Sequence, residues 1–428
     1  MKNFYIHTMG CKANQFESSV IEENLVKNGF NKVTDIREAD LYILNSCSVT
    51  HKSDNEALYM LRAAKHKNPN VKVLVTGCFA QLEKENLLKY DFVDYVFGND
   101  EKLHLYEALS SDSKSDVKDL MTLDKFNEVE LFDTSKTRAS LKIQDGCDNR
   151  CAYCIIWKAR GKSRSASVDF VIRQINRFSQ QGFKEVVLTG IHIGQWGKDI
   201  GLTMLDLLRE IEAKTTIQRY RLGSLNPTEI NDELLDFLQN SKKFCPHFHL
   251  SLQSANDKTL RSMNRFYKTE DYLKQIDDIN KRFDLPFLGS DIIAGFAGET
   301  DEDFNTTVQN LTKSGLTRIH TFPYSMRAGT VGAQLPDQVA DDIKNKRADI
   351  IKAISRDKYD DFVNRNIGKT HEVLIEKHPD KHTGNLKGLT GNYLSVQIVS
   401  DRKDLFNTLC KVKITEYKDG IIFAQLEQ

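Results

Sequence analysis

Short apolar runs alternate with amphipathic segments along most of the chain, as strands alternate with helices in α/β proteins. In the first hundred residues, the apolar runs 4–9, 41–45 and 71–76 predict strands. The segments 16–27, 55–67 and 82–89 carry apolar residues at helical spacing, and Gly29 is placed to end the first helix. This order predicts a parallel sheet with helices on its faces.

A second series of strands and helices is predicted between residues 136 and 366. The runs 138–144, 185–189, 219–224, 247–252, 288–294 and 318–323 predict strands, and the segments 168–181, 204–213, 229–239, 270–283 and 302–313 predict helices. The order predicts a partial (β/α)6 barrel with function at the carboxyl ends of its strands. The charged segment 341–365 predicts a long closing helix that Gly368 ends.

The end of the chain has a different pattern. Strand-like runs at 370–375, 393–398, 410–417 and 421–426 are separated by Gly and charged turns, which predicts a small antiparallel β-barrel. The polar run 110–119 predicts a linker. We therefore predict an α/β protein with an N-terminal domain at 1–110, a linker at 111–135, a partial barrel with its closing helix at 136–366, and a C-terminal barrel at 367–428.

Basic and acidic residues balance over the whole chain, so charge can indicate a function only in local segments. The 428 residues include 60 Lys plus Arg and 60 Asp plus Glu, so nucleic-acid binding would depend on a local patch. Segment 136–164 holds eight basic and two acidic residues, a net charge of +6. Such a run is often only a solvated face, and RNA contact is the alternative interpretation. The RNA-binding candidates in it are Lys158, Arg160, Lys162 and Arg164.

Neither an apolar signal-peptide core nor a run of eighteen uncharged apolar residues occurs in the sequence. We therefore expect a cytoplasmic protein without a membrane partner. Eight cysteines without a secretory signal indicate metal or redox chemistry rather than disulfides. Cys245 and Cys410 are interpreted as ordinary semi-buried thiols.

Three of the cysteines stand close together after a predicted strand. Cys147, Cys151 and Cys154 have the spacing C-x3-C-x2-C. Three thiolates can hold an iron–sulfur cluster and leave one iron open to another ligand, with the Tyr153 ring beside it. A zinc site would need a fourth ligand, and the next histidine, His192, is remote in sequence. A disulfide would leave one thiol unpaired.

Another three cysteines each follow a predicted strand of the N-terminal domain. Cys11, Cys47 and Cys78 are far apart in sequence, but the carboxyl ends of parallel strands share one edge of a sheet. Each cysteine alone is typical of a buried structural thiol. Their repeated placement favours a second three-thiolate cluster with an open iron.

The spacing of Cys147, Cys151 and Cys154, with an aromatic residue before the third, resembles the signature of the radical S-adenosylmethionine enzymes. In that family the open iron is chelated by the amino and carboxylate groups of the cofactor, and an electron from the cluster releases a 5′-deoxyadenosyl radical. The resemblance implies S-adenosyl-L-methionine and 4Fe-4S clusters as cofactors, two clusters if the N-terminal cysteines hold the second.

Several barrel loops resemble those of the methylthiotransferase branch of these enzymes: LTGIHIG at 188–194, HLSLQS at 249–254, MNR at 263–265 and DIIAGFAGET at 291–300. The resemblance implies cofactor contacts at Tyr153, Thr189, Gly190, Ser224, Gln253, Ser254, Arg265, Asp291 and Gly295. The C-terminal segment resembles the RNA-binding TRAM module, with candidate RNA contacts at Lys369, Lys387, Lys411 and Lys413. Family positions usually held by Pro or Gly carry Trp157, Ser251, Ala255 and Ala297, which puts the loop shape in question.

The branch is indicated by GCKANQFES at 10–18 and NSCSVT at 45–50. These segments resemble the enzymes that add a 2-methylthio group to threonylcarbamoyladenosine beside the tRNA anticodon. The resemblance implies a tRNA substrate, an external electron donor and a sulfur donor that the sequence does not identify. Alternatives are the same chemistry on a ribosomal-protein aspartate or on isopentenyladenosine in tRNA, and a non-catalytic tRNA-binding iron–sulfur protein.

Overall fold

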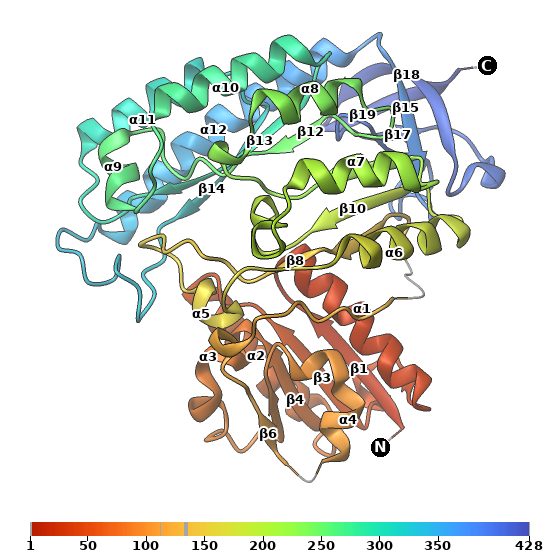
Figure 1. Ribbon diagram of the computed structural model, residues 1–428, viewed down its shortest axis with the longest axis vertical. Coiled ribbons are helices and arrows are strands. Elements are labelled where there is room, and N and C mark those ends of the chain that lie inside the picture. The colour runs from red at the N-terminus through yellow and green to blue at the C-terminus, as the bar shows by residue number, and fades with distance from the viewer. Residues whose placement is uncertain (1, 112, 132–135, 428) are drawn as a thin grey trace.

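The N-terminal domain is a parallel six-stranded sheet in the order β2-β1-β3-β4-β5-β6, at the bottom of the view in Figure 1. The computed structural model describes residues 2–111, 113–131 and 136–427. The strands are β1 (Asn3–Thr8), β2 (Asn31–Lys32), β3 (Leu41–Ser46), β4 (Lys72–Gly77), β5 (Tyr95–Phe97) and β6 (Ser115–Asp116). The predicted parallel sheet is confirmed.

Helices cover both faces of this sheet because its central strands are apolar on both sides. They are α1 (Lys12–Lys27), α2 (His51–Lys67), α3 (Cys78–Leu87) and α4 (Leu105–Ser110). Ile21 of α1 and Leu105 of α4 pack with Ile43 on one face, whereas Leu61 of α2 and Phe79 of α3 belong to the core on the other. Gly29 follows α1 with φ +85°, the left-handed conformation that ends a helix.

The polar stretch interpreted as a linker contributes β6, an edge strand in which Ser115 pairs with Val96. Backbone groups form this ladder, so polar side chains at an edge do not prevent it. Part of the predicted linker therefore belongs to the N-terminal sheet.

The central domain has the six predicted strands, arranged as two three-stranded parallel sheets, β11-β10-β7 and β12-β13-β14. A bridge between Leu225 and Leu250 joins them into one partial barrel. The strands are β7 (Ala139–Lys142), β10 (Glu185–Thr189), β11 (Arg219–Leu222), β12 (His247–His249), β13 (Phe287–Ala294) and β14 (Arg318–Pro323). The (β/α)6 prediction is confirmed.

Amphipathic helices pack on the outside of this barrel. They are α6 (Val168–Gln180), α7 (Met204–Lys214), α8 (Asp232–Asn240), α10 (Thr269–Arg282) and α11 (Asp301–Lys313), and the long α12 (Asp341–Asn366) lies against β14. The short α5 (Ile156–Arg160), α9 (Asp257–Ser262) and the β8 (Gln144–Asp145)–β9 (Arg164–Ser165) pair were not predicted. They are too short to show a periodic pattern.

The C-terminal barrel closes in the order β15-β16-β17-β19-β18. Its strands are β15 (Thr370–Ile375), β16 (Leu386–Thr390), β17 (Ser395–Ile398), β18 (Leu409–Lys418) and β19 (Ile421–Leu426). All pairs are antiparallel except β17–β19, which is parallel. β16 was not among the strands predicted from the sequence. Phe287 and Phe362 of the central domain belong to this barrel's core, so the two domains are packed together.

Within the described residues, no helix is long and apolar enough to cross a membrane.

Candidate functional site

The three N-terminal cysteines stand after β1, β3 and β4, which are neighbours in the sheet. Cys47 and Cys78 are buried and Cys11 is exposed. Gly10 lets the first loop approach the second, since a Cβ at this position would lie 2.7 Å from the Cys47 sulfur. Burial, with a smaller effect of the neighbouring Cys78 and Cys11 thiols, raises the pKa of Cys47 to about 11. The structure therefore brings the three thiols to one edge of the sheet.

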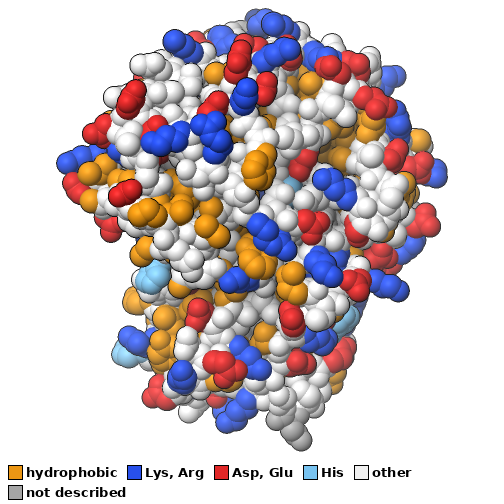
Figure 2. Space-filling model, turned by 60° about the vertical axis from the view of Figure 1, so that its left-hand side comes forward, with side chains coloured by type: hydrophobic (Ala, Val, Ile, Leu, Met, Phe, Trp, Pro, Cys, Tyr) orange, Lys and Arg blue, Asp and Glu red, His pale blue; other side chains and the backbone are white. Residues whose placement is uncertain are grey.

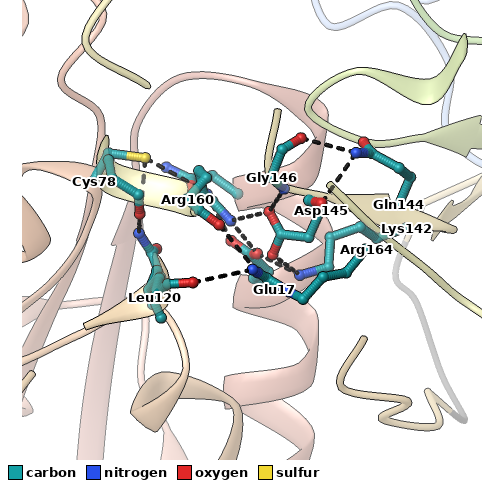
Figure 3. A network of polar contacts seen from close by, with 12 residues as sticks. Glu17, Cys78, Leu120, Lys142, Gln144, Asp145, Gly146, Arg160 and Arg164 are labelled. Atoms are coloured by element: carbon teal, nitrogen blue, oxygen red, sulfur yellow. Dashed lines mark hydrogen bonds and ion pairs between the residues drawn. The ribbon is translucent and has the colours of Figure 1, made fainter. Parts of the chain in front are cut away.

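Arg160 connects this edge to the central domain. Its Nε donates to the Cys78 sulfur at 3.2 Å, while its Nη1 lies 2.5 Å from a Glu17 oxygen. Both Arg160 and Glu17 are fully buried. Figure 3 shows Arg160 between Cys78 and Glu17, with Asp145 and Lys142 beside them.

This buried charge network contains Glu17, Lys102, Lys142, Asp145 and Arg160. Glu17 accepts from Lys102 at 2.6 Å and from Lys142 at 2.7 Å, and Asp145 accepts from Lys142 at 2.9 Å. Burial alone would raise the pKa of Glu17, but its three basic partners hold it well below its usual value. The five charges sum to +1, so an ionised Cys78 would neutralise the group.

The same geometry corrects two of the four RNA contacts predicted in segment 136–164. Arg160 is 0% and Arg164 5% exposed, and Arg164 donates to the carbonyls of residues 120, 160 and 162. Both side chains make their polar contacts inside the protein, so neither is exposed to bind RNA. Lys158 and Lys162 are exposed. On the face shown in Figure 2, basic and acidic side chains are interspersed over the surface.

The second cysteine loop begins after β8 and is held by backbone hydrogen bonds. The Cys147 N–H donates to the Gly161 carbonyl and the Cys154 N–H to the Cys151 carbonyl, both at 3.0 Å. Gly146 has φ +76° and passes so close to Lys162 that a Cβ would overlap its carbonyl. All three thiols are partly exposed. Burial raises the pKa of Cys147 to about 12 and that of Cys154 to about 11.

His192 was regarded as remote from this loop, and the structure corrects that interpretation. Its Nδ1 lies 3.5 Å from the Cys147 sulfur, because β8 and β10 end at the same side of the barrel. Its Nε2 contacts Asn226 and Glu229. Glu229 thereby orients the imidazole toward the cysteine loop.

Arg265 approaches the loop at its second cysteine. Its Nη1 lies 3.6 Å from the Cys151 sulfur, and its Nη2 donates to Asn226 at 2.7 Å and to the Ser251 carbonyl at 2.8 Å. The side chain is 6% exposed. Arg265 was predicted as a site residue, whereas His192 was set aside as remote in sequence, and Asn226 and Glu229 were not predicted, since no local motif connects them to the cysteines.

Thr189 and Gly190 stand where β10 ends. Thr189 is buried, and a Cβ on Gly190 would lie 2.8 Å from both the carbonyl and the side-chain oxygen of Gln144. That side-chain oxygen accepts from the His192 N–H at 2.8 Å. Glycine is therefore needed for β10 to approach the strand that leads to Cys147.

Ser224 and Asp291 both contact His249, which was not among the site residues predicted from the sequence. His249 contacts the Ser224 hydroxyl through Nδ1 at 2.7 Å and an Asp291 oxygen through Nε2 at 3.2 Å. These residues follow or belong to three successive strands. The signal in the sequence was the HLSLQS segment, whose histidine begins it.

The remaining candidates have different surroundings. Gln253 has φ +71° and pairs with β13, since its N–H donates to the Asp291 carbonyl at 2.8 Å. Ser254 is 1% exposed. Gly295 has φ +74°, and its N–H donates to Glu299 at 3.0 Å. Tyr153 packs against a cluster containing Met263 and Tyr324.

Trp157 has a packing role that the sequence did not reveal. The Arg150 guanidinium lies 4.2 Å from its ring centre, and the Lys158 ammonium lies 5.4 Å away. Such cation–π contacts stabilise the packing of the cysteine loop on α5, the helix that follows it. Ala255 and Ala297 are buried, and the Ser251 carbonyl accepts from Arg265.

The two cysteine triads fit iron–sulfur clusters better than a zinc site or a disulfide. All eight cysteines are free, and within the described parts of the chain no three His, Cys, Asp or Glu side chains converge on a single metal ion. A four-iron cluster instead holds its thiolates at separate corners. Each triad offers three thiols with an open side and adjacent buried cations, Arg160 in one case and Arg265 in the other.

A partial (β/α)6 barrel with three thiols in the loop after its first strand defines the radical S-adenosylmethionine class. The comparisons agree: residues 141–311 match the Radical SAM superfamily, and residues 3–98 match the Uncharacterized protein family UPF0004. A similar solved structure is the radical S-adenosylmethionine methyltransferase TsrM from Kitasatospora setae. It has a TM-score of 0.57 and 14% identity over 75% of this chain and 73% of that one, a likeness of fold alone.

Curated relatives define the family more closely. Threonylcarbamoyladenosine tRNA methylthiotransferase MtaB of Thermotoga maritima is 34% identical over 100% of this chain and 98% of its own, and that of Bacillus subtilis is 32% identical over 98% and 96%. A tRNA-2-methylthio-N(6)-dimethylallyladenosine synthase of Thermoanaerobacter is 33% identical over 99% and 93%. The chain belongs to the radical S-adenosylmethionine tRNA methylthiotransferase family, an enzyme family with two 4Fe-4S clusters.

Proposed function

We propose that this protein adds a 2-methylthio group to threonylcarbamoyladenosine beside the tRNA anticodon. The observation that carries the proposal is that the helix following one thiol triad contacts the other triad, since Arg160 of α5 donates to Cys78 across the junction of two domains. Threonylcarbamoyladenosine enzymes among the relatives support this substrate.

In this proposal Cys11, Cys47 and Cys78 hold one cluster and Cys147, Cys151 and Cys154 the other. When bound, the clusters and S-adenosyl-L-methionine supply radical chemistry, which a C–H bond without an acidic proton requires. Arg265 places a positive charge beside Cys151. Glu229 holds the His192 imidazole in contact with Cys147. Cofactor contacts are assigned to Tyr153, Thr189, Gly190, Ser224, Gln253, Ser254, Arg265, Asp291 and Gly295.

The C-terminal barrel contributes RNA binding as a TRAM-like domain in this proposal. Lys369, Lys411 and Lys413 are exposed, and Lys387 is half-buried. Together with the exposed Lys158 and Lys162, they are the candidate RNA contacts. The reaction also requires an external electron donor and a sulfur donor, and we place it in the cytoplasm with its tRNA substrate.

The test is an anaerobic assay of the reconstituted holoenzyme with three substrates: tRNA bearing threonylcarbamoyladenosine, tRNA bearing isopentenyladenosine, and ribosomal protein. Methylthio incorporation into the first alone is expected. Incorporation only into ribosomal protein would overturn the tRNA assignment. A protein that binds tRNA but yields no 5′-deoxyadenosine under reducing conditions would be a binding protein instead.

Isopentenyladenosine in tRNA is the second candidate substrate, because the dimethylallyladenosine synthases are about as similar to this chain as the other relatives are. The two tRNA substrates differ in charge: the threonylcarbamoyl group carries a carboxylate, whereas the isopentenyl group is apolar. Incorporation only into isopentenyladenosine would select this candidate.

A further inference from the structure

A cavity of ≈ 360 Å³ lies where the three domains meet, outside the hydrogen-bonded surroundings of either thiol triad. Its wall includes α1 of the N-terminal domain, the strands β7, β10 and β11 of the central barrel, and β16 of the C-terminal barrel. Ser140, Val187 and Arg221 line it as register neighbours on adjacent strands. Because their neighbours Leu141 and Leu188 pack in the helix-covered core, these three face the inside of the barrel.

The lining is strongly basic, although the whole chain is neutral. Six cations line the cavity against one carboxylate, that of Glu376. The cations are Lys12, Lys136, Arg138, Arg221, Lys381 and Lys387. They come from all three domains, so only the assembled fold gathers them.

Some of these cations already have partners. Arg138 pairs with Glu376 at 2.7 Å, and Arg221 pairs with Glu185 at 2.8 Å. Among the described residues, Lys12, Lys381 and Lys387 make no ion pair. These three ammonium groups therefore remain available to an anion.

Lys12 shares the cavity wall with the guanidinium groups of Arg138 and Arg221. It follows Cys11 directly, is half-buried, and has its Nζ 6.0 Å from the centre of the Tyr393 ring. A bound anion would relieve the repulsion among these cations, because unlike charges attract.

We propose that this cavity binds an oxyanion of the RNA substrate, either a backbone phosphate or the carboxylate of a threonylcarbamoyl group. The proposal rests on the tRNA substrate proposed above. Cations combined with an aromatic ring, here Tyr393, are the combination that proteins use to hold single-stranded nucleic acid. A volume of this size accommodates a nucleotide-sized group.

The experiment measures binding rather than turnover. Fluorescence anisotropy follows the holoenzyme, without added S-adenosyl-L-methionine, as it binds an anticodon stem-loop RNA that carries adenosine, threonylcarbamoyladenosine or isopentenyladenosine. The variants are Lys12→Gln and Lys387→Gln, and the control is Lys274→Gln, which removes an exposed lysine from α10 outside the barrel. Thermal unfolding and iron content verify each variant.

Each cavity variant is expected to weaken binding by about tenfold and to reduce the salt dependence by about one counterion. An equal loss with all three RNAs identifies a phosphate, and a loss confined to the threonylcarbamoyl RNA identifies its carboxylate. Wild-type affinity and salt dependence in both variants would overturn the proposal, and Lys387→Gln remains decisive if Lys12→Gln loses its iron. A wild-type enzyme that binds none of the RNAs would instead refute the proposed tRNA substrate.

Discussion

At the scale of single residues, Arg160 shows how a side chain can serve the interior although its sequence context indicates a surface. It stands in a basic run, and that run predicted RNA contact. In the structure it contacts Glu17, Asn14 and Cys78, all in the N-terminal domain. Sequence could not reveal this, because the partners lie more than eighty residues away and no periodic pattern connects them.

Replacing Arg160 with Gln should lower the reduction potential of the cluster that we propose is held by Cys11, Cys47 and Cys78. Reduction adds negative charge, which the adjacent guanidinium favours. Breaking one partner of a buried ion pair should also cost about 3 kcal/mol of unfolding free energy. The measurements are an EPR-monitored redox titration and thermal unfolding.

The matched control is Arg221→Gln, which removes an equally buried arginine from Glu185. It should cost similar stability and leave the potential of both clusters unchanged. Equal potentials in the Arg160 variant and the wild type would contradict the assigned role.

Gly190→Ala should weaken S-adenosyl-L-methionine binding by about tenfold or more, because the added Cβ would collide with Gln144 and move the end of β10. Isothermal titration of the reconstituted protein measures this. Gly391→Ala is the control, since its nearest contact would be an ordinary 3.7 Å to Pro246. Unaltered affinity in Gly190→Ala would show that this close approach does not shape the cofactor site.

At the scale of elements, the sequence predicted the order of the strands. It predicted only some of the side chains that meet at the strand ends. The apolar runs located β10, β14, β15 and β19 at their observed bounds, because each is a regular strand flanked by polar turns. The rule that parallel strands end at one edge correctly brought Cys11, Cys47 and Cys78 together. The same rule, applied to the central barrel, would have brought His192 to Cys147, a contact that sequence distance concealed.

The seam between the central and C-terminal barrels contains a buried histidine that should make stability depend on pH. His247 packs against the rings of Phe287 and Tyr393, at 5.3 and 4.1 Å between ring centres, and its Nδ1 has no partner among the described residues. Burial lowers its pKa well below the usual value, and nearby positive groups add to this effect. These groups are Arg221, Lys12, His249 and His320.

The unfolded chain binds a proton at His247 near pH 6.5 and the folded protein does not, so stability is lost as pH falls below about 6.5. The loss should approach about 1.4 kcal/mol per pH unit. His247→Phe keeps the stacking and removes the titration, so its melting temperature should fall less between pH 7.5 and 5.5, as read by calorimetry. Parallel pH profiles for the two proteins would contradict this explanation.

At the scale of the whole molecule, the three domains form one structure rather than a chain of independent units. Arg219 and Arg221 of the central barrel donate to carbonyls of the C-terminal barrel, and Arg160 reaches into the N-terminal domain. Sequence predicted each domain from its own periodicity, and it could not predict these junctions, which depend on long-range contacts. Both the buried charge network and the basic cavity lie at such junctions.

The central claim is tested most directly by mass spectrometry of tRNA nucleosides from cells with and without this protein. Loss of 2-methylthio-threonylcarbamoyladenosine is expected in cells that lack it, with threonylcarbamoyladenosine accumulating in its place. The wild-type gene should restore the nucleoside, and a Cys151→Ala variant should not, because it lacks a proposed ligand of the barrel cluster. Persistence of the nucleoside without the protein, or loss of a different methylthio nucleoside, would contradict the account.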